Sequence, residues 1–242
     1  MQPGFFMKPM ENKKLKKSGI KVLVGTFLGP FIQGALIFIS AGRINIPRVW
    51  FYLVVSFISM FGGIVIVYKV NPELLNHRGE WKKKTDAKRW DKFLLLAYGI
   101  TAFYILSVVI GLDIRFQWSY LGINFTIAGI VLFIFASVLV HWAMIVNTHF
   151  ETTVRIQKDR GHKVITTGPY EIVRHPGYVG AILYAAATPL IIGSIVGLIP
   201  AAIAAFVLLI RTSLEDKTLH SELNGYAEYA GTVKYRLFPG VW

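Results

Sequence analysis

The chain has 242 residues, of which 54% are hydrophobic and only 16% are charged. This balance is typical of a protein that crosses a membrane several times, and it excludes an ordinary soluble domain of this length. The sequence contains no cysteine, which excludes disulfides, thiolate metal sites and a cysteine nucleophile. The net charge of +13 would suit nucleic acid, but its distribution along the chain has another explanation, given below.

The N-terminal half predicts a basic arm and four membrane spans. Residues 1–21 carry six lysines and one glutamate, a composition typical of a helix lying on anionic lipid. No small-residue cleavage pattern follows the first apolar run, so we expect that run to be retained as a span. The polar residues 69–92 contain Asn71-Pro72, which predicts the start of a helix. Apolar runs predict spans at residues 22–40, 49–68, 93–112 and 120–146.

The C-terminal half predicts a short helical hairpin. After a second polar segment, residues 147–177, two apolar runs at 178–192 and 195–210 are separated only by Gly193-Ser194. As helices they would cover roughly 22–24 Å each, less than a hydrocarbon core of about 30 Å. We therefore expect a tight hairpin that barely crosses the membrane or turns back inside the protein. The remaining residues, 211–242, predict one amphipathic helix and a packed terminus.

The basic residues indicate how the chain is oriented. Of the 26 lysines and arginines, 23 fall in the N-terminal arm, the two polar segments and the C-terminal tail. The other three, Arg43, Arg48 and Arg115, fall in the intervening loops. The positive-inside rule then predicts both termini in the cytoplasm. We expect the chain to lie in the cell inner membrane. We expect one all-α integral membrane domain with about six embedded helices, partnered by the lipid bilayer and not by nucleic acid.

His141 lies inside the fourth predicted span, where an ionisable residue is a functional candidate by default. Its nearest histidine, His149, is eight residues away, and no acidic residue lies three or four residues from it on that span. A metal site usually needs a denser cluster, so we expect no bound metal. The sequence predicts that His141 is a neutral, hydrogen-bonded packing residue.

The residues from Gly168 to Gly180 form the most unusual polar stretch. Gly168 and His175 each precede a proline, which disfavours helical geometry at both positions. The pattern predicts that Arg174 and His175 lie in an extended turn and that Pro176 opens the next helix. A charged, kinked segment at the membrane edge favours a ligand site. A basic loop that faces lipid headgroups is the alternative.

Arg211 and Glu215 follow the hairpin with a spacing of four residues, which puts them on one helix face. They could form a solvated ion pair or two parts of a binding site. The tail beyond them contains Tyr226, Tyr229 and Tyr235, which are typical of an aromatic girdle at the membrane interface.

Several motifs occur in one order over residues 145–242. They are Val154-Arg155-Ile156-Gln157, Gly161-His162-Lys163-Val164-Ile165, Gly168-Pro169-Tyr170, Arg174-His175-Pro176-Gly177-Tyr178 and Gly180, then Arg211, Glu215-Asp216, Leu219, Tyr226, Tyr229 and Arg236-Leu237-Phe238-Pro239. In this order and approximate spacing they resemble the isoprenylcysteine carboxyl methyltransferase family. The N-terminal spans are similar to that family mainly in being hydrophobic. The chain then divides into residues 1–146, the arm and four spans, and residues 147–242, the cofactor-binding region.

The resemblance implies a membrane methyltransferase that binds S-adenosylmethionine at the cytoplasmic face, beside the hairpin. It implies that Arg211 faces a lipophilic methyl acceptor and acts as the catalytic residue. The cofactor pocket that it implies consists of Gln157, His162, Val164, Ile165, Tyr170, His175, Pro176, Gly177, Tyr178 and Glu215. The chemistry suits these residue types, because an in-line methyl transfer needs alignment and exclusion of water. A carboxylate acceptor would need only a cation to orient it.

One departure and two alternatives accompany the resemblance. The family's usual acidic pair is Glu-Glu, whereas this chain has Glu215-Asp216. The turn also resembles that of membrane reductases of the sterol-reductase type, which use NADPH. Those proteins usually carry an acidic residue directly after the glycine of the turn, whereas this chain has Ala181 there. A non-enzymatic carrier or scaffold leaves the one-sided polar cluster unexplained. The shared residues do not distinguish a carboxylate acceptor from an amine or a thiol.

Overall fold

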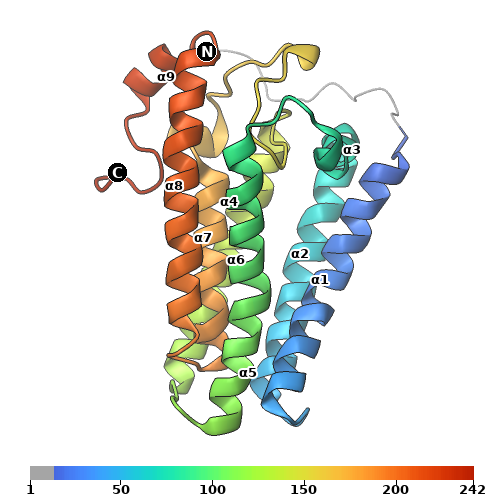
Figure 1. The fold of residues 1–242 in the computed structure, drawn as a ribbon, viewed down its shortest axis with the longest axis vertical. Coiled ribbons are helices and arrows are strands. Elements are labelled where there is room, and N and C mark those ends of the chain that lie inside the picture. Colours follow the sequence, from blue (N-terminus) through green and yellow to red (C-terminus); the bar gives the residue numbers. More distant parts are fainter. Residues whose placement is uncertain (1–13) are drawn as a thin grey trace, which may run out of the picture.

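The computed structural model describes residues 14–242, and this part of the chain is helical without strands. Long helices run side by side, and short helices and loops gather at one end (Figure 1). The long elements are α1 (Lys17–Ala41), α2 (Pro47–Val70), α4 (Arg89–Gly99), a π-helical segment (Ile100–Ile105), α5 (Leu106–Phe116), α6 (Ile123–Val146), α7 (Pro176–Ile192) and α8 (Leu198–Glu222). The short ones are α3 (Pro72–Gly79), α9 (Tyr226–Thr232) and single 3-10 turns at Trp81–Lys83, Lys158–Arg160 and Gly168–Glu171.

Five of these helical stretches are long and apolar enough to cross a membrane. They are α1, α2, the continuous stretch Arg89–Phe116, α6 and α8, and α7 is a shorter apolar helix beside them. The predicted all-α integral membrane fold is therefore confirmed. The predicted surface helix of the arm falls mostly on residues 1–13, outside the described residues, and α1 already begins at Lys17.

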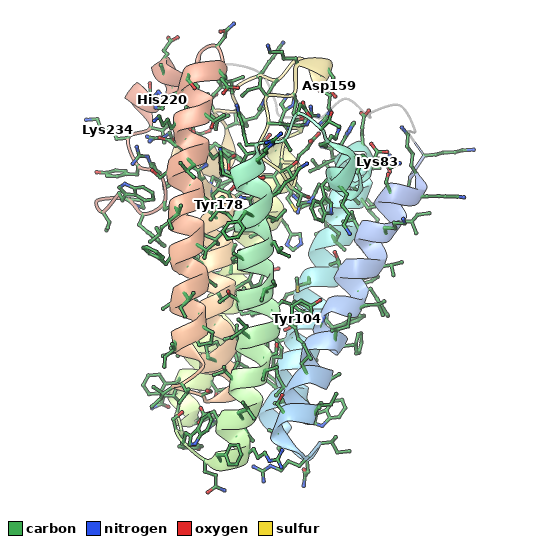
Figure 2. The ribbon with its side chains drawn as sticks, viewed as in Figure 1. Lys83, Tyr104, Asp159, Tyr178, His220 and Lys234 are labelled. Carbon is green, nitrogen blue, oxygen red and sulfur yellow. The ribbon has the colours of Figure 1, made fainter. Side chains whose placement is uncertain are left out.

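The end of the molecule that carries residues 71–88, 147–175 and 223–242 is here called the polar end (Figure 1). Lys83, Asp159 and His220 lie at this end, and Tyr178 lies below them toward the middle of the bundle (Figure 2). The predicted helix start at Asn71 is confirmed. Its side-chain Oδ1 accepts a hydrogen bond from the Leu74 backbone nitrogen at 3.1 Å, which caps α3.

The second helix of the hairpin extends further than the sequence predicted. We expected an apolar helix that ends at residue 210 and a separate amphipathic helix after it, and this boundary is wrong. α8 runs unbroken for 25 residues, to Glu222, and residues 193–197 form the connection from α7. The helix continues through Arg211 and Asp216 because each of these charged side chains has an ion-pair partner inside the protein. Neither side chain therefore needs to reach solvent.

Small residues bring α6 and α7 into close contact. A Cβ atom added at Gly129 of α6 would lie 2.7 Å from the Ile191 backbone nitrogen of α7. One added at Gly180 of α7 would lie 3.0 Å from the Ala136 carbonyl oxygen of α6. Such close approach of two backbones is the usual way in which membrane helices associate.

His141 of α6 is a hydrogen-bonded packing residue, as predicted. Its Nδ1 lies 2.7 Å from the Ser137 carbonyl oxygen, one turn earlier on the same helix. Its ring also packs directly against Gly63 of α2, where no side chain could fit. The histidine therefore joins two spans and does not line the cavity described next.

Candidate functional site

A cavity of about 310 Å³ lies near the polar end. Its walls come from α3, α4, α6, α7, α8, α9 and the segment 147–175. Eleven residues were predicted to contact the cofactor or the acceptor, and ten of them line this cavity. The exception is Pro176, which is buried as the first residue of α7. The ten are Gln157, His162, Val164, Ile165, Tyr170, His175, Gly177, Tyr178, Arg211 and Glu215.

The turn before α7 has the predicted geometry. His175 precedes the helix with φ −127° and ψ 60°, and Pro176 occupies the first turn. The C-terminal tail holds this turn in place. The Arg174 backbone nitrogen donates to the Tyr235 carbonyl oxygen at 3.0 Å, and the His175 nitrogen donates to the Arg236 carbonyl oxygen at 2.9 Å. The imidazole of His175 therefore enters the cavity from a fixed backbone.

Asp216 joins this turn to α8 and to the tail. Its carboxylate is 1% exposed and accepts hydrogen bonds from the Arg174 guanidinium at 2.8 and 3.1 Å. Arg236 Nε and the Tyr226 hydroxyl also donate to it, each at 2.8 Å, and His175 Nε2 lies 3.2 Å away. Asp216 is not a lining residue of the cavity. The shorter acid of the Glu215-Asp216 pair is thus a structural contact between three segments.

Glu215, the other member of the pair, faces the cavity. The Tyr178 hydroxyl donates a hydrogen bond to its carboxylate. The Tyr178 ring stacks on the His175 ring, with centroids 5.8 Å apart and planes 16° apart. The guanidinium of Arg211 lies 5.2 Å from the centre of the Tyr178 ring. One carboxylate, one cation and two stacked rings therefore meet in the cavity wall.

Arg211 pairs with a residue that the sequence analysis did not connect to it. Its Nε donates to the Asp91 carboxylate at 2.6 Å, and its Nη2 donates to the Thr152 carbonyl oxygen at 2.7 Å. Asp91 is fully buried and also accepts from the Val154 backbone nitrogen at 2.8 Å. The third guanidinium nitrogen, Nη1, has no hydrogen-bond partner among residues 14–242. The simple ion pair between Arg211 and Glu215 is therefore not the arrangement found.

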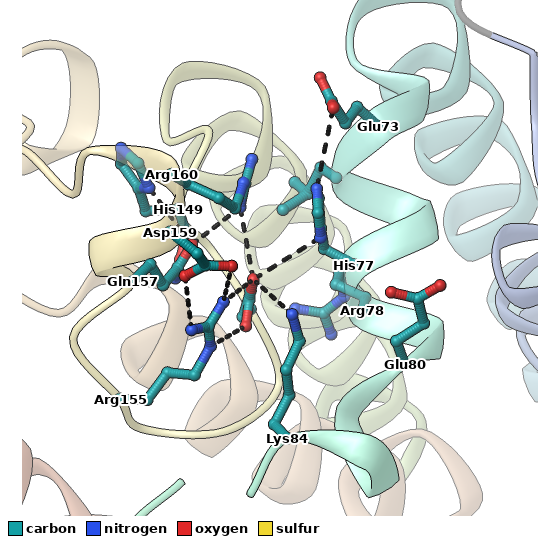
Figure 3. Close-up of polar contacts among 12 residues, drawn as sticks. Glu73, His77, Arg78, Glu80, Lys84, His149, Arg155, Gln157, Asp159 and Arg160 are labelled. Carbon is teal, nitrogen blue, oxygen red and sulfur yellow. Dashed lines mark hydrogen bonds and ion pairs between the residues drawn. The ribbon is translucent and has the colours of Figure 1, made fainter. Parts of the chain in front are cut away.

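A network of charges centred on Glu151 lies beside the cavity, and its members Glu151 and Arg155 line the cavity wall. Figure 3 shows the polar contacts of this network. The Glu151 carboxylate is buried and lies 2.9 Å from Arg155 Nε and 3.4 Å from Arg160 Nη1. Lys84 and His77 approach it at 3.8 and 4.0 Å. This Glu151 network joins the segment 147–160 to α3 and to the loop after it. Burial opposes the charge of Arg155, but its hydrogen bonds to three carboxylates raise its pKa above the ordinary value.

Gln157 and His162 form a neighbouring, uncharged wall. The Gln157 side chain donates to the His149 carbonyl oxygen at 2.7 Å and accepts from Arg160 at 2.8 Å. The His149 and His162 rings lie 4.6 Å apart. Burial, and then repulsion from His149, lowers the pKa of His162 to about 4. His162 is thus neutral at physiological pH and can both donate and accept a hydrogen bond.

Two of the three tail tyrosines do not lie where the sequence predicted. Tyr226 and Tyr229 were expected in an aromatic girdle, but both are buried and line the cavity. Their hydroxyl groups need hydrogen-bond partners there. The Tyr229 hydroxyl donates to the Tyr170 carbonyl oxygen at 2.7 Å, and Tyr226 bonds to Asp216. Tyr235 remains exposed at 39%, as a girdle residue would be.

Comparison with known proteins identifies the segment that builds most of this cavity. Residues 129–221 match the isoprenylcysteine carboxyl methyltransferase (ICMT) family. This segment of the chain is ICMT-like. No curated protein matches the chain. The family match supports a membrane methyltransferase.

The ICMT-like segment contains most of α6 and α8, all of α7 and the polar residues between α6 and α7. All ten lining residues named from the sequence fall within it. The parts of the wall from α3, α4 and α9 fall outside it. Sequence reasoning missed the lining residues of α3 and α4. Tyr98 is a polar side chain inside a predicted span, a pattern that calls for a buried partner. Arg78 was one of eight basic residues in the polar segment 69–92, and nothing in the sequence singled it out.

Proposed function

We propose that the chain is an integral membrane methyltransferase that uses S-adenosylmethionine and methylates a lipophilic acceptor bearing a carboxylate. The observation that carries this proposal is the common cavity. Residues assigned to cofactor and acceptor by resemblance alone, from separate parts of residues 157–215, line the same space. Residues that served only packing or surface charge would have no reason to converge on one cavity.

The residues present suit this cofactor. The cavity volume of about 310 Å³ is at the lower end of the range for small-molecule sites, roughly 300–1,000 Å³. Tyr170, Tyr226 and Tyr229 supply aromatic surface for a planar base and for a cation. Glu215 supplies one carboxylate for a positively charged group, and Tyr178 fixes its position. The neutral His162 adds a polar group without charge.

When bound, S-adenosylmethionine supplies a methyl group activated by attachment to a sulfonium. The protein's task is then to align the acceptor and to exclude water. A carboxylate is already a nucleophile at neutral pH, so no general base is required. Arg211 can hold it through the free Nη1, while Asp91 and the Thr152 carbonyl oxygen fix the other two nitrogens of the guanidinium. The catalytic role of Arg211 is thus orientation of the acceptor.

The cytoplasmic face and the inner membrane belong to the same proposal. The cavity lies near the polar end, whose three segments carry 12 lysines and arginines, against three in the loops at the other end of the spans. Because loops rich in lysine and arginine remain in the cytoplasm, the acceptor would be methylated at the cytoplasmic surface. The acceptor's apolar part would extend toward the membrane layer past Leu95, Val140 and Leu208, which line the cavity on that side.

Ligand-induced stabilisation tests the cofactor. Purified protein in detergent should be stabilised by S-adenosylhomocysteine, the reaction product, because a ligand that binds only the folded state must stabilise it. At 100 times the dissociation constant the gain is about 2.7 kcal/mol. NADPH at the same concentration should have no effect. Stabilisation by NADPH and not by S-adenosylhomocysteine would contradict the methyltransferase assignment and favour a sterol-reductase-type enzyme.

A further inference from the structure

Arg78, on α3, lines the cavity without an acidic partner. Its Nη1 donates to the Phe150 carbonyl oxygen at 3.0 Å, and its guanidinium lies 5.3 Å from the centre of the Phe150 ring. No carboxylate of residues 14–242 forms an ion pair with it. Burial, and then repulsion from Arg211, lowers the pKa of Arg78 to about 10. The side chain is therefore cationic at neutral pH, although its surroundings do not compensate its charge.

The other arginines in the cavity wall are all paired. Arg155 contacts Glu151 at 2.9 Å, Arg174 contacts Asp216 at 2.8 Å and Arg211 contacts Asp91 at 2.6 Å. Glu151 also attracts Arg78, but four other cationic groups or imidazoles already contact its carboxylate. Figure 3 shows Arg78 beside the Glu151 network, outside the dashed contacts. The α3 side of the cavity thus carries an excess positive charge.

Arg78 and Arg211 bind the same short piece of backbone. Arg78 donates to the carbonyl oxygen of Phe150, and Arg211 donates to that of Thr152, two residues further on. The two guanidinium groups, one from α3 and one from α8, therefore flank one small region of the wall. A partly buried cation without a counter-charge is costly, and an anionic ligand that binds between the two groups would remove that cost.

We propose that Arg78 is an acceptor-binding residue that holds the acceptor's carboxylate together with Arg211. This inference rests on the proposed function and narrows it, because an amine acceptor would be repelled by the same two cations. It is independent of the ICMT match, which begins at residue 129, whereas Arg78 belongs to the N-terminal part of the chain. Arg78 would select the acceptor by charge, and Arg211 would orient it.

A matched pair of probes isolates the carboxylate. N-acetyl-S-farnesyl-L-cysteine carries the acidic group, and its methyl ester lacks the charge and is larger by only one methyl group. Each is titrated into protein saturated with S-adenosylhomocysteine, and the binding constant is taken from the shift in melting temperature. The ratio of the two constants within one variant cancels any general loss of stability. This matters because Arg78 also holds the Phe150 carbonyl oxygen.

The wild type should bind the acid at least about tenfold more tightly than the ester. Arg78→Gln should lower that preference to the smaller part that Arg211 provides and leave the affinity for S-adenosylhomocysteine within about twofold. Arg78→Lys should restore part of the preference, because the lysine ammonium keeps the positive charge but cannot form the two parallel hydrogen bonds of a guanidinium. Arg89→Gln is the matched control. It removes the same charge from an exposed residue at the start of α4 that is not part of the cavity wall, and it should behave as the wild type.

An acid preference in Arg78→Gln as large as that of the wild type would overturn this inference and leave the proposed function intact. A loss of S-adenosylhomocysteine affinity in Arg78→Gln would also overturn it, because Arg78 would then serve the cofactor's own carboxylate. Equal binding of acid and ester by the wild type would contradict it directly. Failure of the wild type to bind S-adenosylhomocysteine would instead overturn the proposed function.

Discussion

The two adjacent acids on α8 should have separable roles. Asp216→Asn keeps the size of the side chain but removes the charge that Arg174 and Arg236 contact at 2.8 Å. Because Arg174 is 7% exposed, its guanidinium would remain buried without a counter-charge. Breaking a buried pair in this way costs about 3–5 kcal/mol. For a domain of this size that corresponds to a fall in melting temperature of about 6–20 °C.

Glu215→Gln should show the opposite pattern. It only weakens the hydrogen bond from Tyr178, whose acceptor becomes an uncharged amide oxygen, so its stability should fall by at most about 1 kcal/mol. Its affinity for S-adenosylhomocysteine should fall by about 1.5–3 kcal/mol, the range for a hydrogen bond to a charged group.

Thermal unfolding in detergent and calorimetry with S-adenosylhomocysteine measure the two effects. Glu222→Gln is the control on the same helix, because it removes an exposed ion pair with Lys88 that should contribute at most about 1 kcal/mol. Equal, small losses for both acids would refute the assignment of one to the ligand and the other to the fold.

Three further predictions follow from the site and the topology. Arg211→Lys should leave the affinity for S-adenosylhomocysteine within about twofold and lower the rate of methyl transfer at least tenfold. The reason is that a lysine cannot hold Asp91 and the acceptor together. An unchanged turnover rate would contradict this prediction. Because the pKa of His162 is about 4 in the folded protein and near 6.5 when unfolded, its neutral form is favoured by folding. Stability should therefore decrease as the pH falls, by about 2 kcal/mol from this group between pH 7 and pH 5, and melting curves of His162→Gln should show a weaker dependence. Reporter fusions at Gln117 and at the C-terminus should label opposite sides of the membrane, and same-side labelling would mean that α7 and α8 do not both cross.

Local signals in the sequence were sufficient for much of the fold. The apolar runs located the spans because a membrane helix must be apolar along most of its length. The start of α3 at Asn71 and the non-helical geometry of His175 also depend only on neighbouring residues. The motifs of residues 157–215 located ten of the 31 residues in the cavity wall, because of their resemblance to a known family.

Long-range pairing could not be read from the sequence. Arg211 and Asp91 are 120 residues apart, and only the packed bundle brings them to 2.6 Å. The same contact explains why α8 was predicted too short, because an unpaired arginine would have ended a membrane helix. The tail tyrosines were misplaced for a related reason. A tyrosine in a girdle and one in a cavity wall have the same local pattern, and they differ only in what covers them.

The chemistry of the transferred methyl group separates an ester from an amine or a thioether. A methyl ester releases its methyl group as volatile methanol in alkali, whereas N-methyl and S-methyl groups are retained. Glu215→Gln, with its weakened cofactor site, provides a control in which the transfer should fall at least tenfold.

The most direct test of the account is therefore transfer of a radiolabelled methyl group from S-adenosylmethionine to a membrane lipid extract by the purified wild-type protein. The account predicts label in the lipid fraction that alkali converts to volatile methanol. Label that resists alkali, or no transfer above that of a protein-free sample, would contradict it.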